Sequence, residues 1–365
     1  MTDPAVQRVL IYRLGSLGDT MVALPAFHLV ERAFPNARRV MLTNVPEHAK
    51  APPAAAILGD AGFVHAYINY PVGTRSFREL ARIWFTIRRF RPEVVVYLTG
   101  PRGDAAVYRD LKFFRLCGVR RVIGAPVGDL GVSRLDPDTQ LWETEAARLL
   151  RCLAELGTVD LNDPASWNLR LTDAERRKAN ESLRATEGHP LIVCGPGTKM
   201  QAKDWEQENW RALLTRLSAA APGYALALVG APEDRAVSEY ASAEWRGPVA
   251  NLCGQLTPRE TAAAMQDAEL FLGPDSGPMH LAAAYGVPCA IAFAARDKLG
   301  KWFPSGIHHQ IVFRRVDCAD CGLQTCIAQQ KKCILSISVD EMLAAALAAW
   351  KQRPEAGRAP SSSLQ

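Results

Sequence analysis

The chain has 365 residues, of which 48% are hydrophobic and 22% are charged. This length exceeds one ordinary domain and suits two, and the composition is that of a globular protein with a full core. The net charge of +5, from 43 basic and 38 acidic residues, is too small a surplus to argue for a nucleic-acid partner. The start, Met1–Gln7, has no charged-then-apolar leader, and no stretch reaches the roughly 18 apolar residues of a membrane span. We therefore expect a cytoplasmic protein.

In the first half of the chain, short apolar runs alternate with longer amphipathic stretches, which predicts a parallel sheet covered by helices. The predicted strands are Val9–Arg13, Val40–Asn44, Val94–Thr99 and Arg121–Gly124. The predicted helices are Leu24–Phe34, Phe77–Arg89, Asp104–Cys117 and Glu143–Leu156. Pro25 implies that a short first turn precedes its helix, or that the helix kinks there. The polar stretch Leu161–Thr172 is typical of a connector.

The second half repeats the pattern. Its predicted strands are Leu191–Gly195, Ala225–Gly230, Glu269–Gly273 and Cys289–Phe293. Its predicted helices are Glu208–Ala220, Glu233–Ala243, Arg259–Gln266 and Met279–Tyr285. We therefore predict an α/β fold of two doubly wound, Rossmann-like domains, residues 1–172 and 173–352, with a cleft between them. Residues 353–365, rich in Pro, Ser, Ala and Gly, are expected to form a disordered tail.

Ligands of doubly wound sheets bind beyond the carboxyl ends of the strands, so the loops there are the candidate sites. The first is Gly15–Asp19, whose glycines permit a tight turn and which carries Asp19 to the start of the next helix. A carboxylate there could accept a proton from a substrate hydroxyl. It could equally cap the helix, and local sequence alone favours the cap.

A second loop, Gly195–Lys199, follows the apolar run Leu191–Cys194 and continues to Lys203. Its glycines allow close approach of the backbone, Thr198 offers a hydroxyl, and Lys203 supplies a mobile positive charge for a diphosphate. A lone loop lysine is usually just solvated. Its place after a Gly-Pro-Gly turn at a strand end favours a binding role.

A third loop, Gly273–His280, follows a predicted strand and opens a helix. The backbone N–H groups at such a helix start, together with Ser276 and Gly277, favour a phosphate, and Pro278 suits the first turn. Asp275 could cap the helix, orient the loop or hold a ribose hydroxyl, and His280 could contact a phosphate oxygen. A simple cap and a surface histidine remain an equal alternative on spacing alone.

Four of the nine cysteines are clustered, at Cys318, Cys321, Cys326 and Cys333. Four thiols so close together could hold a structural zinc or iron, with no catalytic role. Their spacing is shorter than that of a typical two-knuckle zinc ribbon. Disulfides are disfavoured in a reducing cytosol, and plain reduced thiols are the remaining alternative.

The stretch Arg75–Arg91 carries six arginines among apolar side chains. A solvated helix face is the simplest interpretation. The alternative is a face that meets an anionic membrane or a phosphorylated acceptor lipid. Arg102, in the loop after the apolar run Val94–Leu98, is a candidate for a direct contact with the acceptor.

Four segments, in this order and at strand ends, carry a resemblance to a known family. They are Arg13–Asp19 with Leu24-Pro25-Ala26; Lys203-Asp204-Trp205 with Glu208-Asn209-Trp210; Gly230–Glu233; and Asp275–Ala284 with Gly286-Val287-Pro288. Together they resemble the bacterial heptosyltransferases that build the lipopolysaccharide inner core, glycosyltransferase family nine. Two departures concern Ser276, which stands where threonine is common, and Lys199, where another hydroxyl residue can occur.

The resemblance implies a GT-B architecture, with an N-terminal acceptor domain and a C-terminal nucleotide-sugar domain. It implies inverting transfer from ADP-heptose to a lipopolysaccharide inner-core acceptor at the membrane surface, with no metal in the reaction centre. By the same resemblance, Asp19 is the catalytic base. The donor contacts implied are Thr198, Lys203, Glu233, Asp275, Ser276, Gly277 and His280. A protein or other glycan as acceptor, or a nucleotide-binding module without turnover, are the alternatives, and the oligomeric state stays open.

Overall fold

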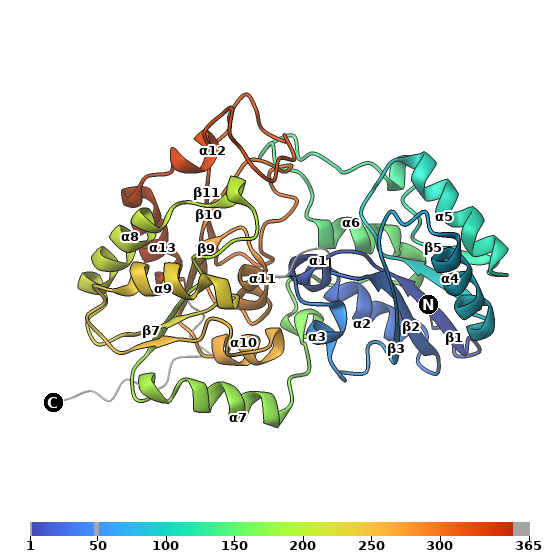
Figure 1. The fold of residues 1–365 in the computed structure, drawn as a ribbon, viewed down its shortest axis with the longest axis horizontal. Helices are drawn as coiled ribbons and strands as arrows, with labels where there is room; N and C mark the ends of the chain where they lie inside the picture. Colours follow the sequence, from blue (N-terminus) through green and yellow to red (C-terminus); the bar gives the residue numbers. More distant parts are fainter. Residues whose placement is uncertain (1, 47–50, 353–365) are drawn as a thin grey trace. The chain divides into compact units, whose positions relative to one another are not determined.

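The computed structural model describes residues 2–46 and 51–352, and the chain forms two compact units, Met1–Arg170 and Leu171–Gln365 (Figure 1). The predicted disordered tail, residues 353–365, lies outside the described residues. Each unit is built around a parallel sheet with helices, as the alternating sequence pattern predicts.

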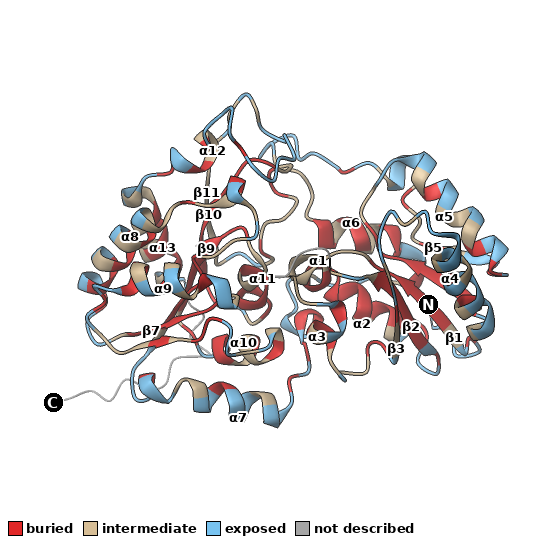
Figure 2. Cartoon of the chain, in the orientation of Figure 1, coloured by how far each residue is buried: buried red, intermediate tan, exposed pale blue. Residues whose placement is uncertain are grey.

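Unit 1 contains a five-stranded parallel sheet in the order β3-β2-β1-β4-β5. Its strands are β1 (Arg8–Tyr12), β2 (Arg38–Asn44), β3 (Ala66–Tyr70), β4 (Val94–Tyr97) and β5 (Arg121–Ile123). The central strand β1 pairs with β2 and β4, so that Ile11 lies opposite both Met41 and Val96. The apolar runs of β1 and β4 are buried, as expected for a sheet covered on both faces (Figure 2).

The helices of unit 1 are α1 (Leu17–Val22), α2 (Leu24–Ala33), α3 (Ala54–Leu58), α4 (Phe77–Phe90), α5 (Asp104–Leu116) and α6 (Glu145–Cys152). Helices α2, α4 and α5 begin and end close to the predicted positions, α6 is shorter than predicted, and α3 was not predicted. The short first turn implied by Pro25 is α1, whose C-cap is Ala23, and Pro25 occupies the first turn of α2. Ser76 caps α4 by accepting a hydrogen bond from the Glu79 N–H, and Arg91 ends that helix in a left-handed conformation.

Unit 2 contains a six-stranded parallel sheet in the order β11-β10-β9-β6-β7-β8. Its strands are β6 (Leu191–Cys194), β7 (Ala225–Leu228), β8 (Val249–Asn251), β9 (Leu270–Pro274), β10 (Cys289–Phe293) and β11 (Gln310–Phe313). Its helices are α7 (Asp173–Ser182), α8 (Gln207–Ala220), α9 (Arg235–Ser242), α10 (Pro258–Met265), α11 (Gly277–Ala284), α12 (Lys332–Leu335) and α13 (Val339–Lys351). None of the helices in the described part of the chain is long and apolar enough to cross a membrane.

The strand order in each sheet reverses next to its first strand. In unit 1, β1 pairs with β2 on one side and β4 on the other, and in unit 2, β6 pairs with β7 and β9. The connections on the two sides of such a strand run in opposite directions, which leaves a crevice at the carboxyl ends where ligands bind. The candidate loops Gly15–Asp19, Gly195–Lys203 and Pro274–His280 all follow strands at these two points.

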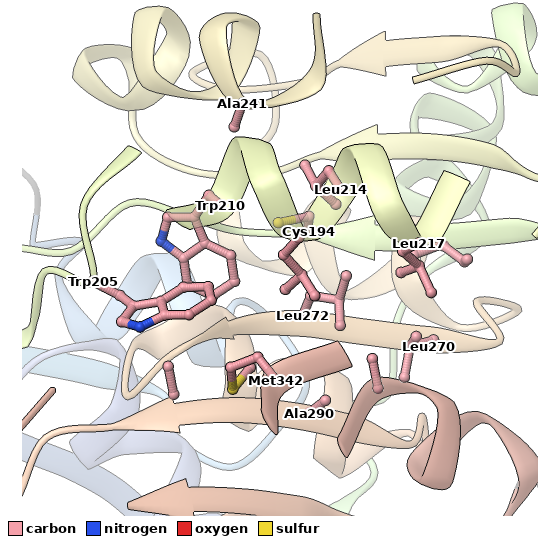
Figure 3. Packing of buried hydrophobic residues seen from close by; sticks show 14 of the residues in the cluster. Cys194, Trp205, Trp210, Leu214, Leu217, Ala241, Leu270, Leu272, Ala290 and Met342 are labelled. Atoms are coloured by element: carbon pink, nitrogen blue, oxygen red, sulfur yellow. The ribbon is translucent and has the colours of Figure 1, made fainter. Parts of the chain in front are cut away.

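The core of unit 2 lies between the sheet and helices α8, α9 and α13 (Figure 3). Trp205 and Trp210 are fully buried in it and meet edge to face, with ring centroids 4.8 Å apart. The Trp205 indole N–H donates to the Ile337 carbonyl over 2.9 Å. The two tryptophans of the Lys203–Trp210 segment are therefore core residues that anchor the loop carrying Lys203.

Candidate functional site

An ion pair joins two of the candidate loops of unit 2. Lys203 Nζ lies 2.5 Å from Asp275 Oδ2, although the two residues are 72 positions apart in the sequence. Their side chains are 13% and 5% exposed, so both charges are largely removed from water. Because a mostly buried charge needs a partner, this pair fixes the β6 loop against the β9 loop at the point where the strand order reverses.

The loop after β9 leads directly into α11, whose N-cap is Ser276. Pro278 lies in the first turn, where its missing N–H costs no hydrogen bond. The Ser276 hydroxyl oxygen is buried and has no hydrogen-bond partner among the described residues. A buried hydroxyl next to the free N–H groups of a helix start is suited to an anionic ligand. Gly277 is half-buried in the same turn, and His280 is buried.

The loop after β6 contains Thr198, whose hydroxyl accepts a hydrogen bond from the Met200 N–H over 3.3 Å and so closes a tight turn. Gly197 packs on Asp234, and a Cβ atom on Gly197 would lie 2.2 Å from Asp234 Cγ. Asp234 is buried and accepts a hydrogen bond from the Ala231 N–H. Its neighbour Glu233 is exposed in the short 3-10 turn Pro232–Asp234, which precedes α9. Sequence reasoning missed Asp234, and the Gly-Ala-Pro-Glu-Asp run after a strand was its only signal.

The segment that carries the four clustered cysteines braces the Lys203 loop. The Cys326 N–H donates to Gln201 Oε1 over 2.8 Å, and the Ala202 N–H donates to the Gln324 carbonyl over 3.0 Å. Lys331 is 5% exposed, forms an ion pair with Glu206 and donates to the Asp204 carbonyl. These bonds hold both sides of Lys203.

The four cysteines of this segment are free thiols. Cys326 is buried, Cys318 and Cys333 are half-buried, and Cys321 is exposed. Burial raises the pKa of Cys333, and the other three sulfurs, which lie close enough to repel its thiolate, raise that pKa further. Within residues 2–46 and 51–352, however, no three His, Cys, Asp or Glu side chains are placed so that they could hold a metal ion.

In unit 1, Asp19 lies in the first turn of α1, directly after β1. Its Oδ2 accepts a hydrogen bond from the Ser16 N–H over 2.8 Å, so the carboxylate does cap the helix. The side chain is still 34% exposed. Gly15 makes this arrangement sterically feasible, because a Cβ atom there would lie 2.2 Å from Asp19 Cβ. The Asp19 carboxylate thus caps the helix through one oxygen and remains partly accessible to solvent at the carboxyl end of β1.

Arg13, which is 2% exposed, lies beneath Asp19. Its guanidinium donates to the Asp19 and Leu98 carbonyls, and so joins the loops after β1 and β4. Burial lowers the pKa of Arg13, and the nearby carboxylates of Asp19 and Glu145 oppose that change. One guanidinium nitrogen lies 4.0 Å from Asp19 Oδ1.

A second buried pair supports the same region. Glu145 and Arg148 of α6 are each 1% exposed and lie 2.6 Å apart, and Arg148 also donates to the Thr99 carbonyl over 3.0 Å. Sequence reasoning missed this pair, because a Glu and an Arg three positions apart on an amphipathic helix resemble a surface ion pair.

Arg102 makes its contacts within unit 1. Its guanidinium donates to the hydroxyls of Tyr12 and Tyr97, over 3.1 and 3.0 Å, and forms an ion pair with Asp110 of α5. The Tyr97 hydroxyl in turn donates to Asp110 over 2.8 Å. This network ties α5 to β1 and β4, and the Arg102 side chain remains 30% exposed.

Residues 131–332, more than half of the chain, match the family model of glycosyltransferase family 9 (heptosyltransferase). Lipopolysaccharide heptosyltransferase 3 of Escherichia coli is 32% identical over 139 residues, 37% of this chain and 38% of that protein. Lipooligosaccharide heptosyltransferase 2 of Haemophilus ducreyi is 26% identical over 338 residues, 85% of this chain and 89% of that protein. The chain belongs to glycosyltransferase family 9 and is a glycosyltransferase.

Solved structures share the fold. The glycosyltransferase family 9 structure from Veillonella parvula has a TM-score of 0.70 at 18% identity, covering 95% of this chain and 98% of that one. ADP-heptose lipopolysaccharide heptosyltransferase II of E. coli has a TM-score of 0.64 at 16% identity, with 95% and 99% covered. The iron-containing heptosyltransferase TibC with ADP-D-beta-D-heptose has a TM-score of 0.51 at 13% identity, with 97% and 78% covered. The predicted pair of Rossmann-like GT-B domains is confirmed.

Proposed function

We propose that this member of glycosyltransferase family 9 transfers a heptose from ADP-heptose, with inversion, to the inner core of lipopolysaccharide. The donor would bind to unit 2 and the acceptor to unit 1. The ion pair of Lys203 with Asp275 carries the proposal, because it brings two phosphate-type loops together beside β6. ADP-heptose is the donor bound to TibC and named for heptosyltransferase II, two proteins of this fold.

In the proposed donor site, the diphosphate lies at the start of α11. The backbone N–H groups of its first turn, the buried Ser276 hydroxyl and His280 would donate to the phosphate oxygens. Lys203, with two N–H donors beyond the one directed at Asp275, would neutralise the charge that develops on departing ADP. Thr198 and Gly277 would complete the contacts, and Glu233 is the proposed partner of the ribose.

In the proposed reaction, Asp19 takes the proton of the acceptor hydroxyl as that oxygen attacks the anomeric carbon. The bond from this carbon to the ADP oxygen breaks at the same time, and ADP leaves with the electron pair. Support for Asp19 comes from its partly exposed carboxylate, held by the Ser16 N–H near the buried guanidinium of Arg13. We also propose Arg102 as an acceptor contact, because its side chain remains 30% exposed.

The acceptor is tested by incubating the protein with ADP-heptose and heptose-deficient lipopolysaccharide, with a glycan lacking lipid and a peptide mixture in parallel. We expect a mass gain of one heptose on the glycolipid alone. Transfer to the peptides or to the lipid-free glycan would contradict the lipopolysaccharide acceptor and identify a protein or another glycan in its place. Binding of ADP without turnover of any acceptor would favour a nucleotide-binding module.

A further inference from the structure

The outward face of α4 carries large apolar side chains in an unusual number. Phe77 is 84% exposed and Phe85 is 63% exposed, and Trp84 is also exposed. Helical spacing places Phe85 opposite Ile83 and Ile87, the buried residues that attach α4 to the sheet, and places Phe77 and Trp84 on one flank of the helix. Burial of Ile83 and Ile87 accounts for the inner face of this helix, but it does not account for the two most exposed rings, Phe77 and Phe85.

The end of α5 continues the same surface. The Trp84 indole N–H donates to the Leu116 carbonyl over 3.0 Å, so the two helices lie side by side there (Figure 1). Leu116 is 69% exposed, and Figure 2 shows the outer sides of both helices as exposed. Arg88 lies over the Trp84 ring, 5.6 Å from its centroid. The apolar side chains thus form one patch over two helices.

Arginines surround these apolar side chains and are not neutralised. Arg78, Arg88, Arg89 and Arg115 are all exposed. In the part of the chain that the structure describes, none of these four forms an ion pair with a carboxylate. Two acids close to α4 in the sequence pair with other arginines, Glu79 with Arg82 and Glu93 with Arg8. We call these four arginines, with Phe77, Trp84, Phe85 and Leu116, the aromatic–arginine patch.

A hollow at the end of α4 adds a place for an anion. It is lined by Arg8, Arg88, Arg89 and Arg91 together with Trp84 and Phe85. Guanidinium groups bind phosphate oxygens through paired N–H donors, and an indole ring favours the region between lipid headgroups and acyl chains. The hollow and the exposed rings therefore match the two layers of a membrane surface.

We propose that the aromatic–arginine patch docks unit 1 on a bilayer that contains anionic lipid. The exposed rings would enter the boundary of headgroups and acyl chains, and the unpaired arginines would contact lipid phosphates. Self-association through the same patch is disfavoured, because a symmetric contact would bring the arginines of two copies together. The inference deepens the proposed function, since it assigns the surface by which the enzyme would reach an acceptor anchored in a membrane.

The test is co-sedimentation of the full chain with vesicles of zwitterionic lipid, with and without added anionic lipid, and with no glycolipid present. We expect binding to the anionic vesicles that weakens as salt rises. Each arginine near an anionic surface contributes about fivefold to binding, so Arg78→Gln with Arg89→Gln should lower the partition coefficient at least about tenfold. Phe77→Ser with Phe85→Ser should also lower it, at the same salt concentration.

A matched control changes exposed residues elsewhere, Ile307→Ser with Arg177→Gln, and should bind as the wild type does. Equal binding of the patch variants and the control to anionic vesicles would overturn the proposal. So would concentration-dependent dimers that the Phe77→Ser and Phe85→Ser changes abolish. Because the vesicles contain no acceptor, a negative result here leaves the transfer reaction untouched, and a failed transfer assay leaves the docking result untouched.

Discussion

Asp19 serves as a helix cap in the structure, and its role as the base remains a prediction. The two roles can be separated, because Asn can accept the same hydrogen bond from the Ser16 N–H but cannot take a proton from an alcohol. We expect Asp19→Asn to change stability by less than about 1 kcal/mol and to lower kcat by roughly 100-fold or more. Thermal melts and initial rates on the same preparation check both values.

A matched control for this change is Ser16→Gly, which removes the Ser16 hydroxyl but keeps the backbone N–H that donates a hydrogen bond to Asp19. We expect it to retain turnover within a few-fold. If Asp19→Asn also retained turnover within a few-fold, Asp19 would be a cap alone and another group would have to be the base.

Lys203 and Asp275 are expected to be coupled in stability as well as in donor binding. Removing one partner of a largely buried ion pair leaves an unpaired charge, which costs roughly 3–5 kcal/mol. We therefore expect Lys203→Met and Asp275→Leu each to destabilise unit 2, and the double variant to lose less than the sum of the two. Chemical denaturation measures the three values. Additive losses would show that the pair is not coupled.

The same lysine can be tested for donor binding under conditions where every variant is folded. We expect Lys203→Met to lower the affinity for ADP at least about tenfold, because an unscreened charge near a diphosphate contributes more than 1.4 kcal/mol. Lys178→Met, which changes an exposed lysine of α7, should leave the affinity unchanged. Titration calorimetry on both proteins makes the comparison, and equal affinities would remove Lys203 from the donor site.

At the level of elements, the sequence predicts most of the long helices and the buried central strands, because each of these has a full apolar run or a clear helical period. Strands β3, β8 and β11 escaped prediction. β8 has three residues, and all three strands are half-buried, so their apolar pattern is short and mixed with polar residues. Helices α7 and α13 also escaped prediction, although each begins with a capping box, Thr172 with Glu175 and Ser338 with Glu341.

A histidine just before β11, His309, leads us to expect that stability depends on pH. His309 Nδ1 accepts a hydrogen bond from the Cys289 N–H, so its Nε2–H donates to the Ser305 carbonyl, and the ring is neutral. Burial lowers the pKa of His309 below its ordinary value, and His308 lowers it further. The unfolded chain therefore binds the proton more readily than the folded chain. The contribution of neutral His309 to stability is complete above about pH 6.5 and is lost as pH falls toward the lower pKa of the folded state.

Melting temperatures at about pH 7.5 and about pH 5.5 measure this effect. We expect the wild type to lose more stability between the two than His309→Gln, whose side chain keeps a donor and an acceptor but does not titrate. A loss of the same size in both proteins would assign the pH dependence to other groups, such as His28, whose pKa burial also lowers.

At the scale of the whole chain, the segment with the four clustered cysteines connects the predicted metal site with the loop of Lys203. The sequence predicts a structural zinc or iron at Cys318, Cys321, Cys326 and Cys333, whereas the described side chains are not placed to hold one, so metal analysis decides between the two. If a metal binds, metal analysis of the purified protein should find about one equivalent, and Cys318→Ser should remove it. Because Cys326 and Gln324 hold the loop of Lys203, we expect metal loss to weaken ADP binding as well.

Cys117→Ala is the control, since Cys117 is buried alone in unit 1 and should not affect the metal content. A purified wild type without metal, or one whose metal content Cys318→Ser leaves unchanged, would favour plain thiols. Loss of metal with unchanged ADP affinity would show that the backbone bonds are enough to hold the loop.

Sequence and structure contribute differently to the candidate site. The sequence motifs predict Lys203 and Asp275 as separate site residues. Their ion pair depends on β6 lying beside β9, which no local pattern reveals. The buried charges of Arg13, Glu145, Arg148 and Asp234 were missed for a related reason. Sequence alone favours an exposed position for a charged residue, because charged side chains are rarely fully buried. Only the tertiary contacts show which of them are covered. The choice of heptose depends on family membership and not on any contact within the chain.

The central claim is that unit 2 binds ADP-heptose and that the enzyme transfers its sugar. Its most direct test is a donor screen by mass spectrometry, with heptose-deficient lipopolysaccharide as acceptor and several nucleotide sugars offered separately. We predict a product heavier by one heptose residue from ADP-heptose, and none from UDP-linked or GDP-linked sugars. A product from another nucleotide sugar, with none from ADP-heptose, would contradict the claim.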